Sequence, residues 1–113
     1  MRQDDPAAVI TRYAAANSDV TCAATVELFL SVYGAQAGNL ALTTLATGGV
    51  YVAGGIVIHM LERLQTGDFL QAFNNKGRMR TVLQNIPVHV MTSSAAALFG
   101  AAALALSPSS AVA

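Results

Sequence analysis

The sequence predicts an α/β fold that is mostly helical, with two short parallel strands at about residues 50–53 and 87–91. Two runs of strand-forming residues carry this prediction: Val50–Val52, which stands between two glycine pairs, and a second run around Val88. Apolar residues at helical spacing fill the segments before, between and after these runs. Strands that alternate with helices pair in parallel. Because two strands alone rarely form a stable sheet, we expect the chain to be part of a larger body.

A first helix is expected from Pro6 to about Ala16. Asp5 can accept hydrogen bonds from its free N–H groups, and proline suits the first helical position. The polar break at residues 17–19 can cap the next helix, expected over about residues 20–46 and bent near Gly34 or Gly38. This long helix is apolar on nearly all sides, which is typical of a buried helix. Its expected face contains Ala24, Leu28, Ser31 and Ala35, widened by Val26, Phe29, Leu30 and Tyr33.

Shorter elements are expected after the first strand. Helical spacing runs from Ile56 to Leu64, residues 66–68 end it, and a short helix follows around Phe69 and Phe73. A polar turn and a brief helix lead to Pro87, which enters the second strand. Residues 92–94 can cap a closing helix over about residues 95–106. Residues 107–113 are expected to form a frayed tail.

The composition argues against several classes of function. The chain has 113 residues, enough for a single domain, and its net charge of zero argues against nucleic-acid binding. No basic segment followed by an apolar stretch begins the sequence, so we expect a cytoplasmic protein. Cys22 is the single cysteine, and together with His59 and His89 it has no metal-site spacing, so no metal site is expected.

Low charge leaves two interpretations open. Hydrophobic residues reach 54% and charged residues only 11%, with none between Glu27 and Glu62 or after Arg80. Leu40–Leu61 is long enough to span a membrane, but threonines, glycines and His59 dilute it, and no basic cluster flanks it. The favoured interpretation is a set of alanine-rich helices that pack within a larger body. A small two-span membrane protein is the less favoured alternative.

The glycine-rich centre, Gly48–Gly55, predicts a strand, a tight Gly-Gly turn and a helix. Such a turn places backbone N–H groups and a bare glycine surface where phosphate or adenine can approach closely.

Several motifs in this order resemble the C-terminal part of bacterial glucokinases. They are Ala37–Leu42 (AGNLAL), Gly48–Ile56 (GGVYVAGGI), Phe69 with Ala72-Phe73, Lys76–Arg78 (KGR), Ile86–Val88 and Ala97–Ala102 (ALFGAA). The resemblance covers about residues 5–106. Val57–His59 and Thr92–Ser94 depart from the family pattern, which usually has a short residue, a proline and a basic residue at the first place and His, Asn or Pro at the second. His59 is therefore interpreted as a surface or partly buried residue rather than a catalytic one.

The resemblance implies a fold of the hexokinase–actin–Hsp70 type, with two ribonuclease H-like lobes and ATP, with magnesium, between them. Residues 1–113 would then form one partial domain, the C-terminal part of a lobe. Ala53, Gly54, Gly55 and Ile56 are identified by this resemblance as the adenosine motif, with Asn39 as a further nucleotide contact. The implied activity is ATP:glucose 6-phosphotransfer in glycolysis.

The groups that a sugar kinase needs for catalysis are missing from the chain. Such an enzyme requires a carboxylate base and a phosphate cradle with magnesium. The six acids, Asp4, Asp5, Asp19, Glu27, Glu62 and Asp68, fall at a terminus, at caps or on helix surfaces, and there is no Asp-x-Gly-Gly-Thr loop. No catalytic residue is therefore assigned, and we expect the isolated chain to be inactive.

Two kinds of partner are consistent with the sequence: the N-terminal lobe of a glucokinase, or a second copy of the chain. The alternative function is a non-catalytic interaction module, or a truncated relic, that binds another chain through a sheet edge and apolar helices.

Overall fold

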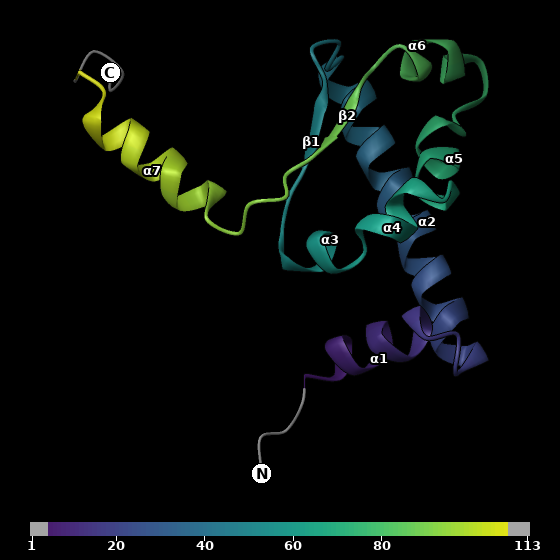
Figure 1. Cartoon of the computed structure of the whole chain (residues 1–113). Coiled ribbons are helices and arrows are strands. Elements are labelled where there is room, and N and C mark those ends of the chain that lie inside the picture. Colours follow the sequence, from purple (N-terminus) through teal and green to yellow (C-terminus); the bar gives the residue numbers. More distant parts are fainter. Residues whose placement is uncertain (1–4, 109–113) are drawn as a thin grey trace.

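The computed structural model describes residues 5–108 (Figure 1). Seven α-helices, one 3₁₀ turn and two strands follow one another as α1 (Pro6–Ala15), α2 (Val20–Thr44), β1 (Val50–Val52), α3 (Gly55–His59), α4 (Leu61–Gln65), α5 (Asp68–Asn74), η1 (Gly77–Met79), α6 (Arg80–Gln84), β2 (Val88–Val90) and α7 (Ala96–Leu106). The prediction of a mostly helical chain with two strands is confirmed. Of the expected frayed tail, residues 109–113 lie outside the described residues.

The two strands pair in parallel, as predicted. Val50 lies opposite Val88, and Val52 lies opposite Val90. Both strands are shorter than expected: Pro87 has no N–H to give to a sheet, and the chain leaves β1 at Ala53 to enter the Gly54 turn.

Capping aspartates fix the starts of α1 and α2, which confirms the prediction for both helices. The Ala7 N–H donates to the Asp5 carboxylate over 3.2 Å, and the Cys22 N–H donates to the Asp19 carboxylate over 2.8 Å. Each carboxylate satisfies a backbone donor that the helix leaves free.

The buried face of α2 differs from the predicted one. Val26, Leu30, Gly34, Ala37, Gly38 and Ala41 are buried, whereas Ala24, Leu28 and Ser31 are exposed. The reason is the pair Gly34 and Gly38, whose missing side chains let the backbone of α5 lie directly on α2. Periodicity of apolar side chains does not register glycine as a packing residue, so the predicted face was right at Val26 and Leu30 and wrong at Ala24, Leu28 and Ser31. The prediction of a helix buried on all sides was also wrong.

A single helix over residues 56–64 was also predicted, and the structure divides it. The backbone at Met60 leaves helical geometry, with φ −111° and ψ 15°, so α3 and α4 meet there at an angle. The Met60 side chain is buried in the core. Its packing outweighs the helical propensity of the surrounding residues.

The core lies between α2, α5, α6 and the inner face of the sheet. Leu30, Phe69, Phe73 and Leu83 are its largest fully buried side chains. The Tyr33 ring packs edge-on against Phe69, with 5.5 Å between ring centroids, and burial raises the pKa of the Tyr33 hydroxyl. At the other end of the body, the Arg63 guanidinium donates to the Ala14 carbonyl oxygen over 2.6 Å and ties α4 to α1.

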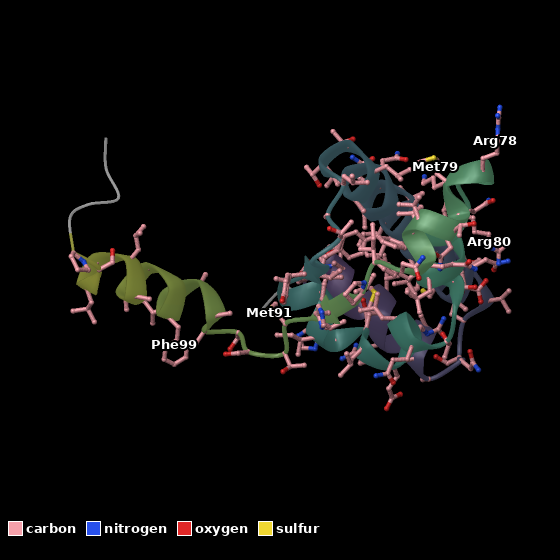
Figure 2. The ribbon with its side chains drawn as sticks, turned by 90° about the horizontal axis from the view of Figure 1, so that it is seen from above. Arg78, Met79, Arg80, Met91 and Phe99 are labelled. Atoms are coloured by element: carbon pink, nitrogen blue, oxygen red, sulfur yellow. The ribbon has the colours of Figure 1, made fainter. Side chains whose placement is uncertain are left out.

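Helix α7 stands apart from this body (Figures 1 and 2). The chain leaves β2 through Met91 and reaches a helix whose side chains, including Phe99, surround it without covering neighbours. Leu98, Phe99, Leu104 and Leu106 are between 68% and 85% exposed. The Cα radius of gyration is 17.0 Å, against about 13 Å for a compact domain of this length. The chain is therefore an open arrangement rather than a closed domain.

One described helix, α2, has the length and composition to cross a membrane. Six of its residues are buried against the rest of the chain, and 22% of its most apolar stretch is buried. The segment proposed from the sequence, Leu40–Leu61, is not one helix, because it contains the end of α2, a loop, β1 and α3.

Candidate functional site

The turn from β1 to α3 contains four of the five residues that the sequence nominates. Ala53, Gly54, Gly55 and Ile56 follow one another at the carboxyl end of β1, and all four are exposed. Gly54 has φ 123° and ψ 162°, a combination that only glycine adopts without strain. The Ile58 N–H donates to the Gly54 carbonyl oxygen over 3.4 Å and begins α3. The glycine thus allows the chain to turn directly from strand to helix.

The surface of this turn is open. A Cβ atom added at Gly54 or at Gly55 would have no heavy atom within 4 Å. The bare backbone therefore faces space that a flat ligand can enter. The same openness means that nothing within the described residues requires a glycine at Gly55 for packing.

The nominated Ile56 lies at the start of α3 and is 47% exposed. Together with Met60 it lines an apolar cavity of about 160 Å³. The other lining residues come from α1 and from the first half of α2: Ala7, Ile10, Thr25, Val26 and Phe29. The Ile56 side chain therefore borders open apolar space, and the glycine backbone beside it is also exposed.

Asn39, the fifth nominated residue, lies elsewhere on α2. Its side chain is exposed. Asn39 follows Phe29, which lines the same cavity as Ile56, by ten residues, and ten residues span about 15 Å along a helix axis. Its carbonyl oxygen accepts a hydrogen bond from the Thr43 hydroxyl over 2.8 Å. The structure therefore brings Ala53–Ile56 together in one turn and places Asn39 apart from it.

The outer face of the sheet presents an aromatic pair next to this turn. The Tyr51 and His89 rings stack, with 4.9 Å between centroids and 24° between planes, and both side chains are exposed. They occupy opposite positions on β1 and β2. Sequence analysis did not identify this pair, since the register that joins two residues so far apart is fixed only when the strands are paired.

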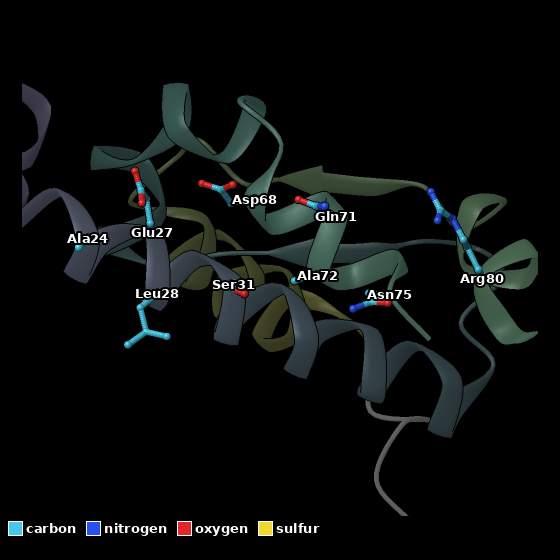
Figure 3. Close-up of a pocket in the computed structure, with 9 residues that line it drawn as sticks. All are labelled: Ala24, Glu27, Leu28, Ser31, Asp68, Gln71, Ala72, Asn75 and Arg80. Atoms are coloured by element: carbon cyan, nitrogen blue, oxygen red, sulfur yellow. The ribbon is translucent and has the colours of Figure 1, made fainter. Parts of the chain in front are cut away.

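A second open cavity, of about 570 Å³, lies along the outer side of α2 and α5 (Figure 3). We call it the α2–α5 groove. It is lined by Ala24, Glu27, Leu28, Ser31, Asp68, Gln71, Ala72, Asn75 and Arg80. Sequence analysis missed it. No local pattern points to it, because its lining comes from α2, from α5 and from the start of α6.

His59 is exposed at the end of α3, in agreement with its interpretation as a surface residue. Cys22 lies at the start of α2, where burial, and then the neighbouring Asp19 charge, raise the pKa of its thiol. Within residues 5–108, no three His, Cys, Asp or Glu side chains gather as metal ligands would.

Comparisons with known proteins match nearly the whole chain. The family model described as Glucokinase matches residues 1–108. A glucokinase of Trichormus variabilis is 46% identical over 98 residues, which cover 87% of this chain and 29% of that protein. A glucokinase of Synechocystis sp. is 46% identical over 101 residues, covering 89% of this chain and 28% of that protein.

A solved structure agrees with these relatives. The crystal structure of a glucokinase from an Antarctic psychrotroph superposes with a TM-score of 0.77 at 37% sequence identity. The match covers 87% of this chain and 30% of that structure. The chain thus spans less than a third of the length of the relatives that it matches.

Proposed function

Because the chain belongs to the glucokinase family, we propose that it is the adenosine-side, C-terminal segment of an ATP-dependent glucose kinase of glycolysis. In this proposal residues 1–113 are part of one ribonuclease H-like lobe, and the protein acts in the cytoplasm. The observation that carries the proposal is the open Ala53–Ile56 turn at the end of β1, in a chain that matches glucokinases along nearly its whole length.

The residues of the turn fit a nucleotide. Gly54 and Gly55 leave free the space that side chains would fill, and their exposed backbone can lie against a flat base or a ribose. ATP supplies the phosphoryl group that is transferred when it is bound. The role of this chain is to bind and orient the adenosine at the turn, where Ile56 lines the neighbouring apolar cavity. Asn39 stays a proposed contact that would require the nucleotide, or a second segment, to extend along α2.

Catalysis itself is assigned to the part of the family proteins that this chain does not cover. A carboxylate must take the proton of the attacking hydroxyl, and magnesium must be held at the phosphates. In the described part of the chain the carboxylates serve as helix caps or lie exposed on helices, and none belongs to the Ala53–Ile56 turn. We therefore propose that the chain alone does not phosphorylate glucose.

The partner in this proposal is the N-terminal part of a glucokinase, and α7 is its docking element. Four large apolar side chains project from α7 in different directions and are all exposed. A helix that is apolar all round becomes stable when it is covered on all sides. This observation also favours the alternative function, a non-catalytic module that binds another chain.

The test uses substitutions at Gly55, because that glycine can change without disturbing the fold. We expect Gly55→Val, introduced at the aligned glycine of the intact Synechocystis glucokinase, to raise the KM for ATP at least tenfold and to leave the KM for glucose unchanged. Gly48→Val, at a glycine before β1 with open space around it and no positive φ, is the matched control. An unchanged KM for ATP in the Gly55→Val enzyme would rule out the proposed adenosine contact.

A coupled assay tests whether the chain alone can phosphorylate glucose. The purified chain should give no glucose phosphorylation above background at saturating ATP and magnesium. A normal hexokinase rate from the chain alone would refute that part of the proposal. Co-expression with the uncovered part of the Synechocystis glucokinase then distinguishes a complementing segment, which restores the rate, from a module that binds without activity.

A further inference from the structure

The outer edge of β2 has no strand beside it. Within residues 5–108 the sheet consists of β1 and β2, and β2 lies on the side toward α5 and α6 (Figure 1). The Val50 N–H donates to the Pro87 carbonyl oxygen over 2.9 Å, so the backbone of Pro87 faces β1. Because backbone groups point alternately to the two sides of a strand, those of Val88 and Val90 point away from β1. Their N–H and C=O groups have no backbone partner in the described part of the chain.

Two open cavities border this edge. The first, of about 420 Å³, is lined by all three residues of β2, with Val52, Thr92 and the residues of α4 and α5 Leu61, Leu64, Gln65, Phe69 and Leu70. The second, of about 290 Å³, continues between α5 and α6 and shares Val88 and Leu70 with the first. We call the two cavities together the β2 groove. One of its walls is an unpaired strand, and the other is helical.

The lining of the β2 groove favours an uncharged occupant. No Asp, Glu, Lys or Arg side chain lines either cavity, and most of the lining side chains are apolar. Leu70, which belongs to both cavities, is 42% exposed. A charged side chain placed in this groove would lose hydration and find no opposite charge in the lining.

The edge also lacks the features that usually prevent strand addition. Edge strands of soluble proteins are commonly protected by a charged side chain, a proline or a bulge. The strand from Val88 to Val90 contains no charged residue and no proline, and its register with β1 is regular. Pro87 precedes the strand and faces β1.

We propose that an extended, uncharged segment of a partner protein binds in the β2 groove as a third strand. Its backbone pairs with the free N–H and C=O groups of Val88 and Val90, which is how strand addition supplies affinity. Paired residues share one face of a sheet, so the side chains of Val88 and Val90 lie on the same face as the buried Val52. Every second side chain of the added strand then enters the cavities beside α4 and α5. These side chains are apolar.

A second copy of the chain fits this groove less well. The β2 side chains of that copy are already packed against its own core, so pairing of the two β2 strands would leave the cavities unfilled. A separate extended segment fills them. The inference goes beyond the proposed nucleotide site and does not depend on it.

The test uses the peptide acetyl-Thr-Val-Thr-Val-Thr-Val-Thr-amide, which is uncharged and alternates polar with apolar side chains. Amide hydrogen exchange of the full chain is measured by NMR at pH 7 with and without 1 mM peptide. Exchange of the Val88 and Val90 amides should slow at least tenfold, because the added strand accepts a hydrogen bond from each. The Tyr51 amide, which faces the outer edge of β1, is the internal control and should not change.

Methylation of the peptide backbone separates strand addition from simple apolar binding. One peptide is methylated at the valine amides and a second at the threonine amides. Only alternate amides of a strand face its neighbour, so one methylated peptide should lose binding and the other should keep it. Loss of binding in both peptides, or in neither, would overturn the proposal.

A charge in the groove provides the test on the protein side. Leu70→Asp should weaken peptide binding roughly tenfold, measured by titration of the Val88 and Val90 chemical shifts. Leu40→Asp is the matched control, at a residue of α2 that is 56% exposed and lies outside both cavities, and it should leave binding unchanged.

Three results would overturn the proposal: no protection of any amide at 1 mM peptide, protection of Tyr51 in place of Val88 and Val90, or equal peptide binding by the wild type and both variants. Protection of Tyr51 alone would assign the third strand to β1. No nucleotide is present in these experiments, so their failure leaves the proposed nucleotide site untouched.

Discussion

At the scale of single residues, the close contact between α2 and α5 depends on two positions that have no side chain, Gly34 and Gly38. Gly34 and Gly38 face the backbone carbonyls of Phe69 and Phe73 at distances that leave no room for a Cβ atom. Because those obstacles are backbone atoms, a methyl group cannot be accommodated by a change of rotamer. The helices would have to separate, and the core between them would loosen.

Gly34→Ala and Gly38→Ala are therefore expected to destabilise the chain by about 1–3 kcal/mol each, the usual cost of overpacking. Urea unfolding monitored by circular dichroism provides the measurement. Gly100→Ala is the matched control, because nothing lies near that position and alanine is the better helix former, so it should not destabilise the chain. Equal midpoints for Gly34→Ala and wild type would contradict the packing described here.

The Asp19 carboxyl makes the free energy of unfolding depend on pH in the acidic range. The hydrogen bond from the Cys22 N–H holds the pKa of the Asp19 carboxyl below its ordinary value. A carboxyl with a lowered pKa in the folded state stabilises above its unfolded pKa, and this contribution is lost as pH falls through the folded pKa. The unfolding free energy should therefore fall as pH is lowered below about 4.

The Asp19→Asn variant isolates this effect. Asparagine also caps helices but does not titrate in this range, so the variant should show a shallower loss of stability below pH 4 by thermal melts between pH 3 and 7. Identical slopes for the two proteins would show that the capping carboxylate does not cause the loss.

Residue-level prediction succeeded where the signal is local and failed where it depends on a partner. The caps at Asp5 and Asp19 act within three residues of their own position, and the sequence alone predicts them. The buried face of α2 depends on α5, which the apolar pattern around Leu28 does not report. The distance of Asn39 from the Ala53–Ile56 turn depends on where α3 meets α2, and no local pattern encodes that.

At the scale of elements, the β1–α3 turn combines one glycine that the backbone needs with one that it does not. Gly54 has a φ of 123°, and Gly55 has no positive φ. The Gly-Gly pair predicts a turn from sequence, but only the structure tells the two positions apart. The predicted helix over residues 56–64 is likewise divided at Met60, where burial of the side chain overrides the helical propensity of the surrounding residues.

Alanine substitution should separate the two glycines. Gly54→Ala should cost about 1–3 kcal/mol because alanine is strained at this backbone geometry. Gly55→Ala should change stability by less than about 0.5 kcal/mol, as an exposed substitution with open space does. Guanidinium unfolding of both variants is the measurement, and a larger loss for Gly55→Ala than for Gly54→Ala would contradict the assignment.

At the scale of the whole molecule, the chain is flat and incomplete as a folded body. Its principal extents are 53 × 48 × 19 Å, and α7 lies away from the core. The expectation that a chain with two strands is part of a larger body came from the sequence, which also shows that no charged residue follows Arg80. The position of α7 could not be predicted, because an apolar helix carries no local information about which surface covers it.

The exposed apolar surface of α7 should be measurable. The wild-type chain should bind the dye ANS, and the double variant L98E/F99E should bind much less while keeping the same unfolding midpoint. Val20→Glu, at an apolar residue that is 86% exposed on α2, is the control and should change dye binding only slightly. Dye binding that is equal in all three proteins would place the exposed apolar surface elsewhere.

The parallel pairing of β1 and β2 has a consequence for the order in which the chain folds. Val50 and its partner Val88 are 88 − 50 = 38 positions apart. Closing so long a loop costs conformational entropy before any hydrogen bond between the strands can form. The intervening α3–α6 segment can shorten that loop by condensing on α2 through Phe69 and Phe73. The helical layer should therefore assemble first and act as the template on which β2 finds its register with β1. Hydrogen-exchange pulses during refolding would then protect the amides of α2 and α5 before those of the two strands.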